Sequence, residues 1–104
     1  MNIKQAKEIP VEKVLERMGY LPQKISGFDL WFISPFRLLE KTPSFKINTK
    51  INKWFDHGEG FGGNTLDFVI KKSGCTVSDA LVFLKDFSVF FSFHQQENCL
   101  DIPE

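Results

Sequence analysis

The sequence predicts an α+β fold in which a central antiparallel sheet of about four or five strands is flanked by helices. Three observations predict this class. Apolar residues recur at helical spacing over residues 11–18. After a glycine-rich stretch, two further helical patterns begin at residues 64 and 76. Between these helical segments lie four short runs of strand-like composition, at residues 23–26, 29–33, 45–48 and 53–55.

The N-terminal helices are predicted from their caps and their periodicity. Asn2 is a good cap for a short helical turn over residues 2–8, and Pro10 suits the first position of a second helix. Gly19 is placed to end that second helix. The apolar residues that share one face of it are Val11, Val14, Leu15 and Met18.

Two hairpins account for the predicted strands, and two helices follow them. Ser26 and Gly27 form the turn of the first hairpin, and residues 49–52 form the turn of the second. The glycines between residues 58 and 63 break regular structure, either as a tight turn or as backbone donors for a phosphate. Asn64 then caps a helix that ends at Gly74, and the chain returns to helix after Thr76.

The C-terminal segment differs from the rest of the chain in composition. Residues 87–104 begin with a run rich in phenylalanine and end in polar sequence. Exposure of so many phenylalanine side chains to water is unfavourable, and the polar end resembles a linker. We therefore predict one domain over residues 1–86, followed by a Phe-rich tail or linker at residues 87–104 that leads toward a missing C-terminal region.

Composition places the chain in the class of small globular domains. It has 104 residues, 42% of them hydrophobic, with 12 phenylalanines to build a core. Its two cysteines are far apart and form no Cys-x-x-Cys pair, which argues against a disulfide scaffold and a thiolate metal site. We find no signal peptide and no apolar run long enough to span a membrane. A cytoplasmic protein without a membrane partner is the expectation.

Charge is balanced overall but unevenly distributed. Thirteen basic and thirteen acidic residues give a formal net charge of zero, which is weak support for a free-standing nucleic-acid binder. Residues 41–55, however, contain no acidic residue, and Asp56 and Glu59 follow directly. One surface can therefore be basic although the whole chain is neutral. The lysines within that stretch are Lys41, Lys46, Lys50 and Lys53.

Two segments of the chain carry a recognisable motif. Residues 34–37 read Ser-Pro-Phe-Arg, residues 40–45 read Glu-Lys-Thr-Pro-Ser-Phe, and residues 54–64 contain Asp-His-Gly-Glu-Gly before Gly-Asn. The pattern resembles the zinc-binding domain at the N-terminus of bacterial replicative DNA primases, in which Cys-Pro-Phe-His precedes Glu-Lys-Thr-Pro-Ser-Phe and Cys-x-x-Cys-Gly. The resemblance covers residues 9–84, with one extra residue after Arg37. It implies a zinc β-ribbon.

The resemblance places the four zinc-ligand positions at Ser34, Arg37, Asp56 and Glu59, none of which is a cysteine or a histidine. Structural zinc needs four ligands, usually thiolate or imidazole. Ser34 is a poor ligand, and the guanidinium of Arg37 repels a cation. We therefore predict a degenerate ribbon that has lost zinc, and no other cofactor. An alternative is a hard or borderline metal held by Asp56, His57 and Glu59.

The guanidinium of Arg37 supplies a cation at these positions in place of zinc. If the two halves of the motif face one another as in the family, Arg37 meets Asp56 and Glu59, and a guanidinium can bridge two carboxylates. Taken as a surface ion pair, this contact is worth about 0–1 kcal/mol. We therefore expect the Phe-rich core and the flanking helices to supply most of the stability.

The resemblance also implies a function. In the primase family this domain helps to recognise single-stranded template, and a separate domain makes the primer. The implied role is a non-catalytic DNA-binding module of a DNA primase-like protein in DNA replication, with single-stranded DNA and a primase catalytic domain or a helicase as partners. The extent of ligand loss suggests a mobile element. The candidates for template contact are Lys41, Lys46, Lys53 and Trp54, because cations meet phosphates while aromatic rings stack on bases.

Two other classes remain open from the sequence. The first is a zinc-free protein-interaction or structural module that keeps the ribbon fold, which net charge zero and the Phe-rich tail favour. The second is an enzyme acting through Asp56, His57 and Glu59, although no nucleophile or magnesium-binding acidic cluster accompanies them. Lysines gathered on one face of the sheet favour the DNA-binding class. Lysines scattered around the sheet favour protein interaction.

Overall fold

The N-terminal third of the chain forms two short helices. The computed structural model describes the backbone of residues 1–37 and 39–101, and the side chains among them up to residue 89. α1 (Ile3–Glu8) begins at Asn2, whose side chain and backbone amide exchange hydrogen bonds with those of Gln5. α2 (Val11–Arg17) follows, with Pro10 as its N-cap rather than its first helical residue. Gly19, at a φ of 96°, turns the chain away after the helix.

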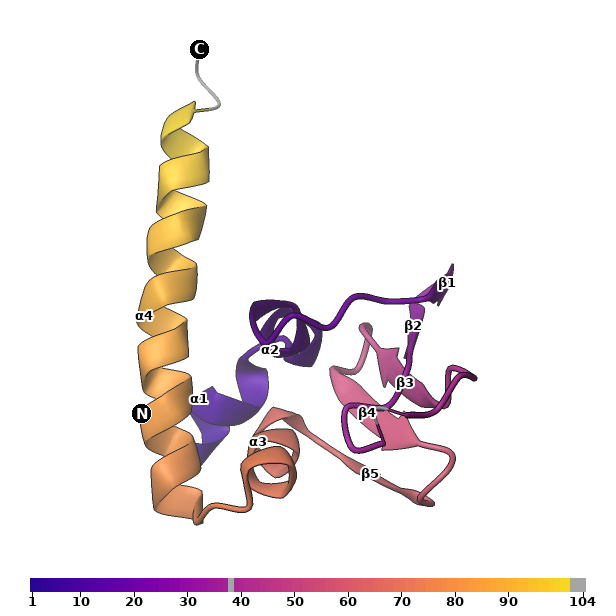
Figure 1. Cartoon of the computed structure of the whole chain (residues 1–104). Helices are drawn as coiled ribbons and strands as arrows, with labels where there is room; N and C mark the ends of the chain where they lie inside the picture. Colours follow the sequence, from indigo (N-terminus) through magenta and orange to yellow (C-terminus); the bar gives the residue numbers. More distant parts are fainter. Residues whose placement is uncertain (38, 102–104) are drawn as a thin grey trace.

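Five strands form one antiparallel sheet in the order β1-β2-β3-β4-β5 (Figure 1). The first four strands match the predicted runs to within one residue at either end. β5 was not predicted, because glycine is a poor strand former. It pairs Gly62 with Phe55 and Gly63 with Trp54. The strands are β1 (Lys24–Ser26), β2 (Asp29–Phe32), β3 (Phe45–Asn48), β4 (Lys53–Asp56) and β5 (Phe61–Gly63).

Two helices complete the fold. α3 (Thr65–Ser73) begins at Asn64, the predicted cap, and ends at Gly74, which adopts a φ of 64°. α4 (Val77–Asp101) follows, and the Thr76 hydroxyl accepts a hydrogen bond from the Asp79 amide at 3.1 Å. The predicted boundary between residues 86 and 87 lies inside α4, and Phe87 is buried in the core. Among the described residues, no helix is long and apolar enough to cross a membrane.

The helices gather on one side of the sheet, and the core lies between them (Figure 1). The ring of Phe45 stacks on that of Trp54 with centroids 5.4 Å apart, and Phe68 of α3 packs against both rings. This aromatic cluster supplies the bulk that a small domain needs to bury. Its buried neighbours include Phe32, Ile47, Leu66 and Val69.

Asn52 joins the turn between β3 and β4 to the helices. Its backbone adopts a φ of 55°, a conformation that asparagine tolerates better than most residues. Its side-chain oxygen accepts from the Val11 amide at 2.9 Å, and its side-chain nitrogen donates to the carbonyls of Lys7 and Ile9 at 3.0 and 2.9 Å. The Thr65 hydroxyl donates to the same Ile9 carbonyl. One side chain thus fixes the α1–α2 junction against the sheet.

Candidate functional site

Two loops meet at the end of the sheet where β2 and β4 terminate, next to the aromatic core. The first follows β2 and carries Ser34 and Arg37, and the second follows β4 and carries Glu59 just after Asp56. The Ser34 hydroxyl donates a hydrogen bond to Oδ2 of Asp56 at 2.7 Å, and both side chains are fully buried. The structure therefore brings together all four positions that the motif assigned to zinc ligands.

Arg37 is the centre of this group. Its Nη2 donates to Oδ1 of Asp56 at 2.7 Å, and its Nη1 donates to Oε2 of Glu59 at 2.9 Å. The two contacts expected from the sequence are therefore present. The guanidinium has two further partners that sequence reasoning missed, Glu40 at 2.6 Å from Nε and Ser44 at 2.7 Å from Nη2. We call this group of six residues the Arg37 clasp: Ser34, Arg37, Glu40, Ser44, Asp56 and Glu59.

The burial of Asp56 corrects the expectation of a surface ion pair. The side chain of Asp56 is 0% exposed and that of Arg37 is 25% exposed, whereas Glu59 is 41% exposed. Oδ1 of Asp56 also accepts from the backbone amides of Gly58 and Glu59, at 2.9 and 3.0 Å. A buried carboxylate with this many donors is costly to disturb, because every donor loses its partner at once.

The ionisation of the clasp follows from these contacts. Burial by itself would raise the pKa of Asp56, but hydrogen bonds from Arg37, Ser34 and the Glu59 amide outweigh it, so the pKa of Asp56 lies below its ordinary value. Hydrogen bonds from Arg37 and Ser44 likewise lower the pKa of Glu40. Hydrogen bonds to Asp56 and Glu40 raise the pKa of Arg37. Arg37, Asp56 and Glu40 are therefore charged at neutral pH.

Gly58 lets the guanidinium lie directly against the second loop. A Cβ atom at this position would overlap the end of the Arg37 side chain. The absence of a side chain, rather than backbone freedom, is therefore what this position requires. Gly58 thus admits the Arg37 guanidinium to the second loop.

The clasp does not fit zinc. Its donor set contains no thiolate and no imidazole, and a guanidinium that stays protonated occupies the space between the carboxylates. Over the described parts of the chain, no group of three or more histidine, cysteine, aspartate or glutamate side chains could hold a metal ion. The alternative set of Asp56, His57 and Glu59 is not assembled, because Asp56 points into the core while the ring of His57 stacks on Trp31 across the other face of the sheet.

The face of the sheet that the helices leave open carries a mixed row of cations and rings. In an antiparallel sheet, residues directly opposite one another point to the same side. Lys24 lies opposite Trp31, Trp31 opposite Lys46, and Lys46 opposite Phe55. We call these four residues, from four adjacent strands, the outer row. Nζ of Lys46 lies 5.8 Å from the centre of the Trp31 ring.

The predicted template contacts separate in the structure. Lys46 belongs to the outer row. Lys53 lies on the same face, two residues before Phe55 on β4 and opposite Asn48. Lys41 is exposed in the loop before β3. Trp54 is only 3% exposed, and its indole N–H donates to the Asn64 carbonyl at 2.7 Å, so its ring is a core group and not a surface for stacking. Alternation along β4 places Trp54 and Lys53 on opposite faces.

Three rings on the open face are not among the predicted template contacts. The His57 ring stacks on Trp31 with centroids 5.3 Å apart and meets Phe55 edge-on at 4.8 Å. The Phe55 ring lies over Gly62, where a Cβ would approach it to 2.9 Å. Counting alternate residues outward from Lys53 would have found Phe55 and His57.

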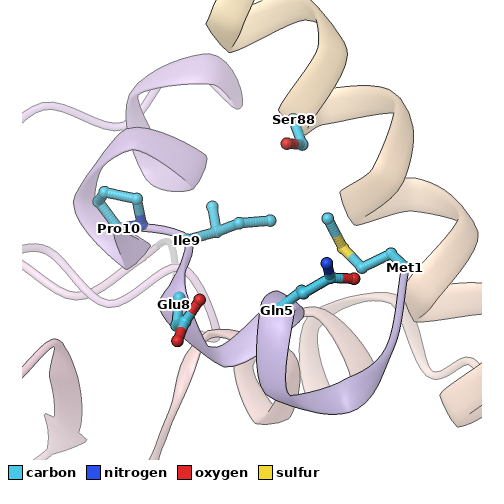
Figure 2. A pocket seen from close by; sticks show the side chains of 6 residues that line it. All are labelled: Met1, Gln5, Glu8, Ile9, Pro10 and Ser88. Atoms are coloured by element: carbon cyan, nitrogen blue, oxygen red, sulfur yellow. The ribbon is translucent and has the colours of Figure 1, made fainter.

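Two hollows accompany these surfaces. One, of about 460 Å³, lies beside the outer row and is lined by residues that include Lys46, Lys53, Phe55 and Gly62. The other, of about 370 Å³, lies between α1 and α4, and Figure 2 shows Met1, Ile9 and Ser88 around it. The second hollow is lined by Met1, Gln5, Glu8, Ile9, Pro10 and Ser88, a set without a lysine or arginine side chain to recognise a phosphate.

Comparisons with known proteins agree with the motif. The family model described as the CHC2 zinc finger matches residues 2–98. The crystal structure of the primase from Aquifex aeolicus, comprising zinc-binding and RNA polymerase domains, is similar with a TM-score of 0.66 and 24% sequence identity over 80% of this chain. The match spans 20% of that primase chain. No curated protein matches the sequence.

Proposed function

We propose that this chain, which belongs to the CHC2 zinc finger family of DNA primases, is a non-catalytic module that binds single-stranded template DNA without zinc. The module would serve DNA replication within a primase-like protein, for which the extent of ligand replacement suggests a mobile element. The observation that carries the proposal is the outer row, in which lysines and aromatic rings alternate across the open face of the sheet.

The chemistry of the outer row suits a single strand. The ring cluster of Trp31, His57 and Phe55 would offer aromatic surface on which bases of any identity can stack, and the lysines between and beside these rings can neutralise phosphates. Base stacking on an aromatic residue is worth about 1–3 kcal/mol per base. Lys53 extends the cationic surface by one residue pair. This gathering on one face supports DNA binding over the scattered arrangement that protein interaction would favour.

One acidic side chain limits the extent of the proposed surface. Asp29 lies opposite Asn48 on the same face as Lys53. A carboxylate there would repel phosphate, so the strand is expected to run along the outer row rather than toward Asp29. Changing Asp29 to asparagine should therefore strengthen binding at low salt.

The Arg37 clasp makes the proposal independent of metal. The proposed template-binding face needs β2, β3 and β4 held in register. The clasp ties the loop after β4 to the loop after β2, the strands on either side of β3, through the Arg37 side chain. The proposed module would therefore keep its sheet in the presence of a chelator.

The test is a fluorescence anisotropy titration of a labelled single-stranded oligonucleotide at low and at moderate salt. We expect binding that weakens as salt rises, because lysines release counterions from the phosphates. Lys46→Glu should abolish most of it, and Trp31→Ala should weaken it about tenfold, since one stacked base is lost. Lys85→Glu is the matched control, because Lys85 is an exposed lysine on α4 that is remote from the open face.

Equal losses in Lys46→Glu and Lys85→Glu would reduce the effect to net charge and contradict the assignment of a face. Absence of binding at low salt would favour the second candidate function, a protein-interaction module. That candidate is supported by the exposure of large apolar residues away from the open face, including Val82 and Val89 of α4, at 61% and 65%.

A further inference from the structure

A small groove opens between α2 and the hairpin of β1 and β2, on the side of the sheet that faces the helices. Its volume is about 180 Å³. The floor is apolar, formed by Leu30 and Phe32, and the walls combine apolar side chains with two acidic and one basic side chain. The walls include Leu21, Ile25, Glu12, Lys13 and Glu16.

The apolar surface of this groove is incompletely covered. Ile25 lies opposite Leu30, which lies opposite the buried Ile47, so all three share the inner face of the sheet. Ile25 is nevertheless 68% exposed, and Leu21 beside the same groove is 65% exposed. The helical layer therefore ends before the inner face does. Two large aliphatic side chains are left at the opening.

The backbone beside the groove is also unpaired on one side. β1 is the first strand in the sheet order, and its three residues are exposed. An edge strand presents free amide and carbonyl groups, and an extended segment can join it as a further strand. A segment that does so places alternate side chains on the inner face, where the groove begins.

The acidic side chains of the groove favour a ligand that carries a positive charge. Oε1 of Glu12 is buried and, within the described part of the chain, has no hydrogen-bond partner. Glu16 lies one turn along α2 and pairs with Lys13 at 3.6 Å. A buried carboxylate oxygen without a donor is unfavourable, and a turn of the Glu12 side chain toward a cationic side chain of a ligand in the groove would satisfy it.

From these observations we propose that the groove binds an extended segment of a partner protein. The segment adds a strand to β1, places an aliphatic side chain between Leu21 and Ile25, and directs a lysine or arginine toward Glu12. The groove lies on the face opposite the outer row, and the two sites share only the strand β1, which carries Lys24 on one face and Ile25 on the other, so this proposal and the DNA-binding proposal can fail independently.

The experiment is an NMR titration of the 104-residue chain with a short peptide that alternates valine and lysine. We expect amide shift changes at Leu21 and along β1. Ile25→Lys and Leu21→Ser should each weaken binding about tenfold, a loss of one well-buried aliphatic contact. Val82→Lys is the matched control, since Val82 is 61% exposed on α4 and lies outside the groove. Glu12→Gln should remove the preference over a peptide that alternates valine and glutamate.

Several results would overturn the proposal. These are the absence of any shift changes, shift changes confined to other parts of the fold, equal affinity of the wild-type chain for the glutamate peptide, and undiminished binding by Ile25→Lys. Concentration-dependent shifts of β1 without peptide would also overturn it, because the occupant would then be a second copy of the chain. Oligonucleotide binding that survives in Ile25→Lys would show that the two surfaces are separate.

Discussion

Asp56 is the residue on which both loops of the Arg37 clasp converge. Its two carboxylate oxygens accept hydrogen bonds from Ser34 and Arg37 and from the amides of Gly58 and Glu59. The side chain is fully buried. A carboxylate in this position gains from its donors what it loses in hydration, but removing it leaves the donors without partners. Stability should therefore depend more on Asp56 than on the exposed Glu59.

Asp56→Ala should destabilise the fold by about 3 kcal/mol, the usual cost of removing one partner from a buried ion pair. Urea denaturation followed by tryptophan fluorescence measures it, because Trp54 is buried beside the site. Glu59→Ala is the control and should cost at most about 1 kcal/mol, since Glu59 is largely solvated. Equal costs for the two variants would contradict a buried clasp.

The clasp also predicts how stability depends on pH. Asp56 and Glu40 have folded-state pKa values below their ordinary values. At a pH between the folded-state and the ordinary pKa of each group, the unfolded chain therefore binds more protons than the folded chain. Their contribution is present above the ordinary carboxyl pKa of about 4 and is lost as pH falls through the folded-state values. Melting temperature should fall below about pH 4. In Asp56→Asn this fall should be shallower, and an unchanged slope would show that Asp56 does not contribute to it.

Prediction of individual contacts from the sequence succeeded where the family motif indicated which two loops face one another. It brought Arg37 to Asp56 and Glu59, but it treated the pair as exposed and missed Glu40 and Ser44. Burial depends on how neighbouring side chains fill the core, which a motif does not specify. Trp54 illustrates the same limit, since its place in the motif suggested a ligand contact while strand alternation places it in the core.

At the scale of elements, the turn between β3 and β4 positions the helices as well as the strands. Asn52 bonds to the backbone of Lys7, Ile9 and Val11, which surround the α1–α2 junction. The helical side of the domain is thereby fixed to the strands that carry the open face.

Asn52→Gly and Asn52→Ala separate the two contributions of this residue. Both variants lose the hydrogen bonds and should be destabilised by about 1–3 kcal/mol through unsatisfied backbone groups. Alanine should be the worse of the two, because a φ of 55° is strained for a residue with a Cβ and no local hydrogen bond. Thermal unfolding of both proteins measures the difference. A glycine variant as stable as the parent would show that only the turn conformation matters.

Element prediction was accurate where caps and alternation were clear. Asn2, Asn64 and Gly74 mark helix ends in the sequence, and the structure has helices that begin and end there. β5 escaped notice because its pairing depends on glycines that let the Phe55 ring lie against the backbone. That role is visible only once β4 is beside it. The start of α4 after Thr76 was predicted, but its extension beyond residue 86 was not, because the phenylalanines there show no helical amphipathicity.

At the scale of the whole molecule, the zinc-ribbon frame persists although its ligand set has changed. The motif matches a family whose name records a zinc finger, and the fold is similar to that of the Aquifex primase domain. In this chain the same four positions converge around a guanidinium. We infer that the fold requires a tie between two loops and that an arginine can supply it.

This inference predicts that the frame can accept zinc again. A variant carrying Ser34→Cys, Arg37→His, Asp56→Cys and Glu59→Cys restores the family's ligand order at positions that already lie together. It should bind about one zinc ion per chain, because a structural site needs four such ligands in tetrahedral contact. Metal analysis and a chelator-dependent fall in melting temperature measure this. A folded variant that binds no zinc would show that the loops no longer have the family's spacing.

The most direct measurement is oligonucleotide binding by the unmodified chain after its metal content has been determined, with and without a chelator. We expect salt-sensitive binding of single-stranded DNA by protein that contains no zinc, with the same affinity in the presence of the chelator. Stoichiometric zinc in the purified protein, or binding that disappears when the chelator is added, would contradict it.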